Sequence, residues 1–99
     1  MSAAIQLDHL AINTICLRHS VQTLSLFGSA IHGTFGPDSD LDFLVQFLPG
    51  HQPGHFKLAA LQLDLEQALG RRVDLKTAAE LSQYFREQVI QEAVVQYAA

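Results

Sequence analysis

The sequence has few of the features that mark secreted, membrane-spanning or nucleic-acid-binding proteins. Cys16 is the only cysteine among 99 residues, so no disulfide can form within the chain, as is usual in a reducing compartment. No apolar run approaches the length that crosses a bilayer, and no basic segment precedes an apolar one at the N-terminus. We therefore expect a cytoplasmic protein that makes no membrane contact.

Positive charge is also scarce. Six Lys and Arg residues stand against ten Asp and Glu residues, and the formal net charge is -4. A protein that binds DNA or RNA usually carries a basic surface, so a nucleic-acid substrate is not expected. The length fits a single domain over residues 1–99. Because 48% of the residues are hydrophobic, such a small body should leave apolar surface for a homo- or hetero-oligomeric contact.

The spacing of apolar residues predicts alternating helices and strands. The predicted helices and strands are a helix over 5–17, a strand over 21–27, a strand over 41–47, a helix over 58–69 that ends at Gly70, a strand over 71–75 and a last helix over 85–97. This order favours a small α/β (α+β) fold in which helices cover a sheet of three or four strands. The short link between the first two strands permits antiparallel pairing.

Two carboxylates open the second predicted strand. The strand period of two places Asp40 and Asp42 on one face and Leu41 on the other. Like charges this close raise each other's pKa unless a cation offsets the repulsion, and hard oxygen ligands suit Mg²⁺ or Mn²⁺. The alternative is a solvated turn in which Asp38 or Asp40 caps backbone N–H groups.

A glycine-rich segment separates the first two predicted strands. Gly28-Ser29 ends the first strand, and a backbone without a Cβ followed by a helical turn can approach the phosphates of a nucleotide. The alternative is an ordinary helix cap. The glycine spacing from Gly28 to Gly33 matches a Walker loop, but Thr34 stands where the essential lysine belongs, which excludes that motif.

A third carboxylate lies in the short strand after Arg71 and Arg72. Asp74 stands there between apolar neighbours, and its simplest local role is an ion pair with one of the two arginines. If this strand lies beside the second one, Asp74 instead completes a cluster of three carboxylates, where it could bind metal or accept a proton.

The segment from Gly28 to Val45 resembles the signature of the DNA polymerase β-like nucleotidyltransferase superfamily. In that signature Gly-Ser is followed by a strand with an Asp-x-Asp pair and later by a third Asp. With Val73-Asp74-Leu75 and the C-terminal segment added, the chain looks most like the minimal nucleotidyltransferase subfamily over nearly its whole length. The resemblance implies a palm-like fold with a small mixed sheet covered by helices.

The same resemblance implies a reaction, a partner and residue roles. Members of the subfamily transfer AMP from ATP, with Mg²⁺, to a hydroxyl, and many are antitoxins that modify a tyrosine of a HEPN-type toxin. The resemblance assigns nucleotide binding to Gly28, Ser29 and Gly33, and metal binding and catalysis to Asp40, Asp42 and Asp74. An antitoxin that neutralises its partner by binding alone is the alternative.

One stretch departs from the family pattern. Members often carry arginines between Gly-Ser and the next glycine, whereas this chain has Ala30, Ile31 and His32. Less positive charge is therefore expected to face the triphosphate from this loop.

Overall fold

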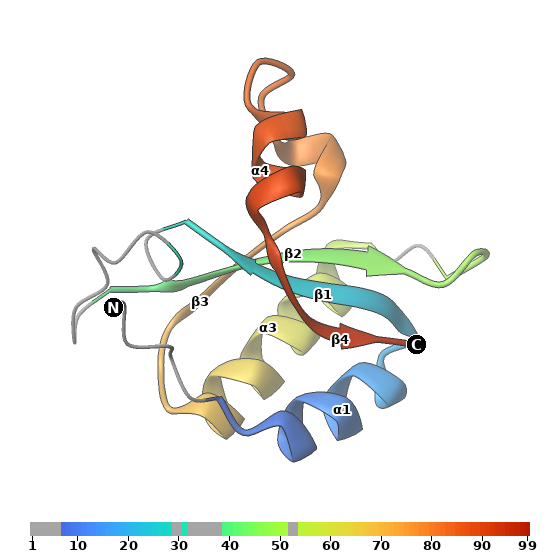
Figure 1. The fold of residues 1–99 in the computed structure, drawn as a ribbon. Coiled ribbons are helices and arrows are strands. Elements are labelled where there is room, and N and C mark those ends of the chain that lie inside the picture. The colour runs from blue at the N-terminus through green and yellow to red at the C-terminus, as the bar shows by residue number, and fades with distance from the viewer. Residues whose placement is uncertain (1–6, 29–30, 32–38, 52–53) are drawn as a thin grey trace.

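Two helices pack against one face of a four-stranded sheet (Figure 1). The computed structural model describes residues 7–28, 31, 39–51 and 54–99. In chain order the elements are α1 (His9–Arg18), β1 (Val21–Phe27), β2 (Leu41–Phe47), α3 (His55–Leu69), β3 (Val73–Lys76), the 3-10 helix η1 (Ala78–Glu80), α4 (Arg86–Glu92) and β4 (Val94–Ala98). The strand order is β3-β2-β1-β4, with β2 and β3 parallel and the other pairs antiparallel. The predicted mixed sheet covered by helices is confirmed.

Local chemistry sets the ends of both covering helices. The Asp8 side chain accepts a hydrogen bond from the Ala11 N–H at 3.1 Å and caps α1, so the helix begins at His9. The start predicted at residue 5 lies outside the described residues. The helix α3 ends at Gly70, whose φ of 67° is the left-handed conformation that terminates helices. The end predicted for this helix is therefore confirmed.

The core lies between the sheet and these two helices. Alternate residues of β2 turn toward it, since Leu41, Phe43 and Val45 are all buried. They share one cluster with Ile12 and Cys16 of α1 and with Leu61 and Leu65 of α3. Burial raises the pKa of the Cys16 thiol to about 12, so the thiol stays protonated and packs as a small apolar group.

The C-terminal segment differs from its sequence prediction. A single helix over 85–97 was expected, but α4 ends at Glu92 and Ala93 has an extended backbone (φ -63°, ψ 140°). The next residues form β4, which pairs antiparallel with β1. The prediction was wrong because apolar spacing alone cannot sense that β1 has an open edge, and the β-branched Val94 and Val95 suit a strand that fills it.

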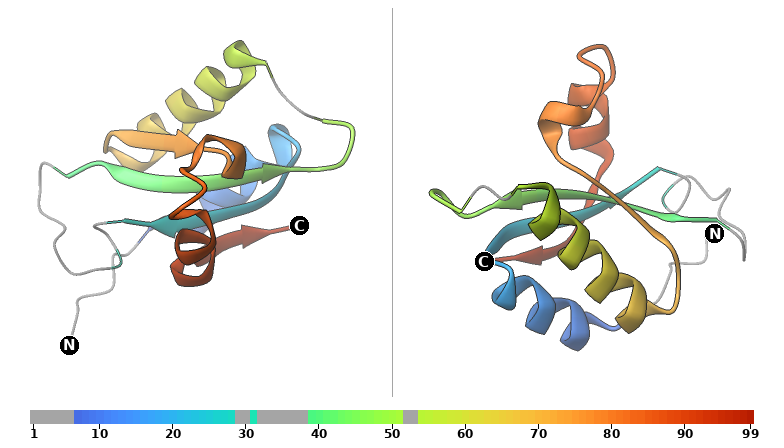
Figure 2. Two further views of the ribbon diagram at one scale, coloured as in Figure 1. Left: turned by 90° about the horizontal axis from the view of Figure 1, so that it is seen from above. Right: turned by 180° about the vertical axis from the view of Figure 1, so that it is seen from behind.

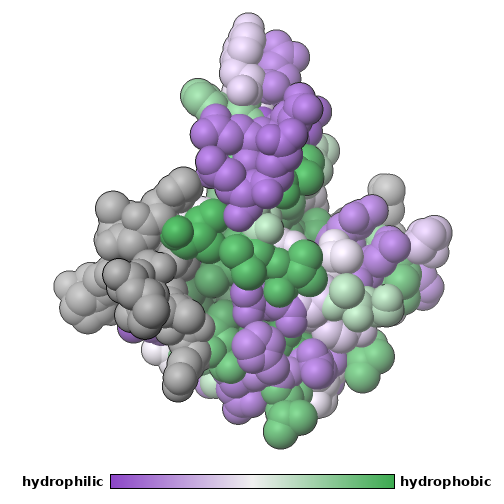
Figure 3. All heavy atoms as spheres, viewed as in Figure 1, coloured by the Kyte–Doolittle hydropathy of each residue, from purple (hydrophilic) through white to green (hydrophobic). Residues whose placement is uncertain are grey.

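The opposite face of the sheet is covered less by helices. Both views in Figure 2, together with Figure 1, place α4 on the side of the sheet opposite to α1 and α3. Exposed apolar side chains gather there: Figure 3 shows apolar surface below the hydrophilic part of α4, and Ile90, Val94 and Val95 are about half exposed. None of the helices in the described ranges is long and apolar enough to cross a membrane.

Candidate active site

The sheet register brings two of the predicted acidic residues together. In the parallel pair of β2 and β3, Asp42 lies opposite Asp74 and Leu41 lies opposite Val73. Leu41 and Val73 are buried in the core, so Asp42 and Asp74 project from the other face of the sheet. Asp40 precedes β2 and is exposed at the same end. The third strand thus lies beside the second, which was the condition stated for Asp74 to join the other two acids.

The charges of Asp40 and Asp74 both act on Asp42. Desolvation by burial raises the pKa of Asp42, and the negative charges of Asp74 and Asp40 raise it further, while the Lys76 ammonium lowers it. A carboxylate with a raised pKa is unfavourable in its ionised form. The folded chain therefore holds Asp42 in an environment that a cation would stabilise.

The raised pKa of Asp42 predicts a pH-dependent stability difference. Because the folded state binds this proton more tightly than the unfolded chain, the contribution of Asp42 to stability is greatest below its unfolded pKa of about 3.8 and is lost as the pH rises through its higher folded pKa. We expect the melting temperature of Asp42→Asn to be close to that of the wild type near pH 4. At pH 7 we expect it to be roughly a few degrees higher than that of the wild type. Thermal unfolding without divalent cations, followed by circular dichroism from pH 4 to pH 8, measures the difference. A difference in melting temperature that becomes smaller toward pH 7 would contradict the raised pKa of Asp42.

The backbone of Gly28 lies directly against Asp42. Gly28 follows β1 with a φ of 77°, and an ideal Cβ at this position would collide with Asp42 Oδ2 and lie 3.2 Å from Asp42 Cγ. The Gly28 carbonyl accepts a hydrogen bond from the Ile31 N–H at 3.1 Å. Only glycine fits both the backbone angle and the space. Ser29 and Gly33, which were predicted to bind the nucleotide, lie outside the described residues.

Asp74 has a cationic partner that the sequence analysis did not consider. Lys76 Nζ lies 3.4 Å from Asp74 Oδ1, whereas Arg71 and Arg72 were the partners expected on local grounds. The available signal was the strand period of two, which places residues 74 and 76 on one face of β3. All six Lys and Arg residues lie in the described ranges, and Lys76 is the one whose charge acts on Asp42.

Residues 11–96 match the family described as the nucleotidyltransferase domain. The chain belongs to this family. The match spans β1, β2 and β3 with the first part of β4 and includes Gly28, Asp40, Asp42 and Asp74, so the geometry described above lies inside the shared domain. The enzyme class is that of a nucleotidyltransferase.

Relatives of this nucleotidyltransferase domain include proteins named for one reaction. A Thermococcus cleftensis protein named protein adenylyltransferase MntA is 36% identical over 77 residues, which cover 78% of this chain and 76% of that protein. A solved structure described as a proposed minimal nucleotidyltransferase is 40% identical with a TM-score of 0.72, covering 87% of this chain and 86% of that one. A second solved structure holds a tri-AMPylated Shewanella oneidensis HEPN toxin with an MNT antitoxin. The matched chain is 20% identical, the match covers 92% of this chain and 70% of that one, and the TM-score of 0.65 shows a shared fold.

The donor set of the nucleotidyltransferase domain suits a hard divalent cation held together with a nucleotide. Among the described residues, no three His, Cys, Asp or Glu side chains form a ready-made metal cage. Mg²⁺ does not require one, because proteins usually bind it through one or two carboxylates plus substrate phosphates. Asp42 and Asp74 would be the two carboxylates, and the absence of a Cβ at Gly28 lets the Asp42 carboxylate lie directly against the backbone there.

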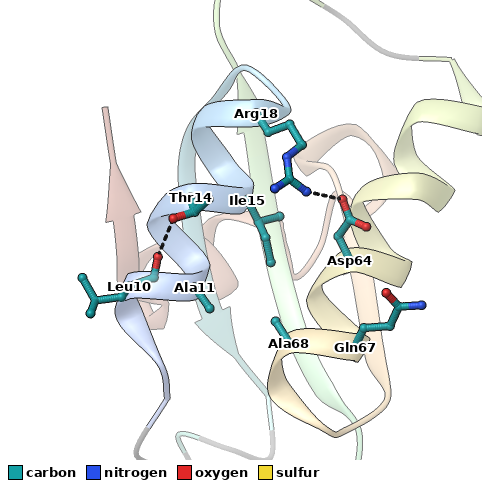
Figure 4. A pocket seen from close by; sticks show the side chains of 8 residues that line it. All are labelled: Leu10, Ala11, Thr14, Ile15, Arg18, Asp64, Gln67 and Ala68. Atoms are coloured by element: carbon teal, nitrogen blue, oxygen red, sulfur yellow. Dashed lines mark hydrogen bonds and ion pairs between the residues drawn. The ribbon is translucent and has the colours of Figure 1, made fainter.

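A groove lies on the other side of the sheet. A groove of about 510 Å³ runs between α1 and α3 and is lined by Ile15, Arg18, Asp64 and their neighbours. Figure 4 shows Arg18 and Asp64 reaching across it, with 3.5 Å between Arg18 Nη1 and Asp64 Oδ2. Asp64 also binds His19 Nε2 at 2.7 Å. These groups neutralise one another on the helical side of the sheet, so the groove offers no free charge for a phosphate.

Proposed function

We propose that this chain is a Mg²⁺-dependent protein adenylyltransferase that transfers AMP from ATP to a tyrosine hydroxyl of a HEPN-type toxin, and so acts as the antitoxin. The observation that carries the proposal is the pairing of Asp42 with Asp74 on the open face of the sheet, with Gly28 directly against Asp42. Family membership supports nucleotide transfer. The name of the Thermococcus relative and the AMPylated HEPN toxin in the structural neighbour support the acceptor class.

The proposed roles follow from position. Gly28 and Ser29, with Gly33, bind the phosphates of ATP, because the backbone at Gly28 can approach a ligand without a side chain between them. Asp40, Asp42 and Asp74 would hold Mg²⁺, which when bound offsets their repulsion and the charge that develops on the phosphate oxygens. Asp74 also accepts the proton of the attacking hydroxyl.

The reaction is tested with a purified HEPN-type toxin as the acceptor protein. We expect incubation with ATP and Mg²⁺ to raise the mass of that protein by one or more AMP groups, and we expect EDTA to prevent the change. Intact-mass spectrometry measures the addition, and peptide fragmentation identifies the modified residue. An unchanged partner mass at saturating ATP, despite a stable complex, would refute the transferase proposal.

An antitoxin that only binds its partner is the second candidate. It is favoured by the exposed apolar side chains near the C-terminus, where Tyr84 is 82% exposed and Phe85 is 60% exposed. Apolar surface of this kind on a small domain commonly marks a protein contact. This candidate predicts full neutralisation of the toxin without ATP, and the transferase predicts that neutralisation requires ATP.

A further inference from the structure

Lys76 lies on the side of the acidic residues away from Gly28. Because β1 runs antiparallel to β2, Phe27 pairs with Asp42, and Gly28 continues toward the N-terminal end of β2. Lys76 instead pairs with Leu44, two residues further along β2 than Asp42. Two strand residues span about 6.6 Å, so Gly28 and Lys76 flank the Asp42–Asp74 pair from opposite ends.

This arrangement separates donor and acceptor. In phosphoryl transfer the attacking and leaving oxygens lie roughly in line on either side of the phosphorus. If the Gly28 turn holds the phosphates that leave as pyrophosphate, as the proposed function states, the attacking hydroxyl must approach from the opposite end. The structure places the charged side chain of Lys76 at that end, with its Nζ 3.4 Å from Asp74 Oδ1.

The neighbours of Lys76 suit an aromatic acceptor. The register aligns Val95, Ser25, Leu44 and Lys76 in one row across the four strands, next to the row that contains Asp42 and Asp74. Leu44 is half-buried and Val95 is 59% exposed. Apolar side chains that lead to an ammonium group match a phenol, which has an apolar ring and a polar oxygen.

We propose that Lys76 is an acceptor-binding residue, whose ammonium donates a hydrogen bond to the phenolic oxygen of the incoming tyrosine while the ring packs on Leu44. This inference rests on the proposed function. In the step, the phenolic proton passes to Asp74, the phenolic oxygen forms a bond to the α-phosphorus, and the bond from that phosphorus to the bridging oxygen breaks. Pyrophosphate leaves, and the tyrosine carries AMP through a phosphodiester. Lys76 stabilises the negative charge that develops on the phenolic oxygen.

The test compares Lys76→Met and Lys76→Arg with the wild type, and uses Lys57→Met as the control because Lys57 is an exposed lysine on α3. Steady-state AMP transfer is measured with ATP, Mg²⁺ and the purified HEPN-type partner, and calorimetry measures ATP binding in the absence of the partner.

We expect Lys76→Met to lower kcat by about 10²-fold and to leave the affinity for ATP within about twofold. The deficit should shrink as the pH approaches about 10, where a phenol ionises without help. Lys76→Arg should recover most of the rate, and Lys57→Met should match the wild type.

Two results would overturn the inference while the proposed function stands. If Lys76→Met weakens ATP binding tenfold or more with the acceptor KM unchanged, Lys76 is a ligand of the triphosphate. If the rate loss is the same at every pH, follows a lowered melting temperature and is not recovered by Lys76→Arg, Lys76 has only a structural role. Failure of the wild type to transfer AMP would instead refute the proposed function itself.

Discussion

Asp42→Asn is expected to abolish AMP transfer and to leave the folded domain and its complex with the partner intact. The amide keeps the shape of the carboxylate but removes the central negative charge of the three acids, where burial and two neighbouring carboxylates already raise the pKa of Asp42. Loss of a cation ligand at the reacting centre should lower the rate by about 10³-fold or more. The mass of the partner after incubation with ATP and Mg²⁺ measures the transfer, and size-exclusion chromatography measures the complex.

The matched control is Asp8→Asn. Asp8 also carries one negative charge, but it caps α1, and asparagine caps helices as well as aspartate does. We expect this variant to transfer AMP at the wild-type rate. Mg²⁺ with ATP should raise the melting temperature of the wild type and of Asp8→Asn, because ligands that bind only the folded state stabilise it, and should have little effect on Asp42→Asn. If Asp42→Asn transfers AMP at the wild-type rate, the Asp42 carboxylate is not required for the reaction, and the proposed mechanism is wrong. Loss of transfer with full neutralisation of the toxin would favour the binding-only antitoxin.

Gly28→Ala adds only one methyl group, but we expect it to lower AMP transfer strongly. The new Cβ would occupy the position of Asp42 Oδ2, so either the carboxylate or the turn must move. An alanine at a φ of 77° also strains the backbone by about 1–3 kcal/mol. We expect transfer to fall by about 10²-fold and ATP binding to weaken, because displacement by one ångström at a reacting centre has effects of this size. Transfer assays and calorimetry with ATP measure the two effects.

Gly50→Ala separates backbone strain from the collision. Gly50 has nearly the same backbone angle, with a φ of 81°, but nothing lies within 4 Å of an added Cβ. The two variants should lose similar stability from strain, and only Gly28→Ala should lose activity. Equal transfer by the two variants would show that contact between Gly28 and Asp42 is unimportant for the reaction.

Several features of this chain follow from local sequence alone. The residues from Asp40 to Phe43 were sufficient to place the two carboxylates on one face of a strand and Leu41 on the other, because strand geometry has a period of two, and Leu41 is buried in the core. The α3 stripe that ends at Gly70 was equally clear, since glycine adopts the left-handed angle without strain. The resemblance carried by Gly28, Asp40 and Asp42 identified the family because these residues lie within one continuous segment.

Other features depended on contacts between distant residues. The strand β4 and the expected helix have the same local apolar spacing, and the open edge of β1 decided between them because backbone groups there need partners. Asp74 is 32 positions from Asp42, and only the parallel register places them side by side, at a distance at which their charges interact. The pairing of Asp74 with Lys76 also depended on the structure, because Lys76 lies in β3 with Asp74, whereas Arg71 and Arg72 precede the strand. The sequence by itself therefore determined the first three strands, the helix that ends at Gly70 and the residue types of the site. The tertiary structure decided the C-terminal strand and which charges meet, because an electrostatic interaction depends on distance through space and not on separation along the chain.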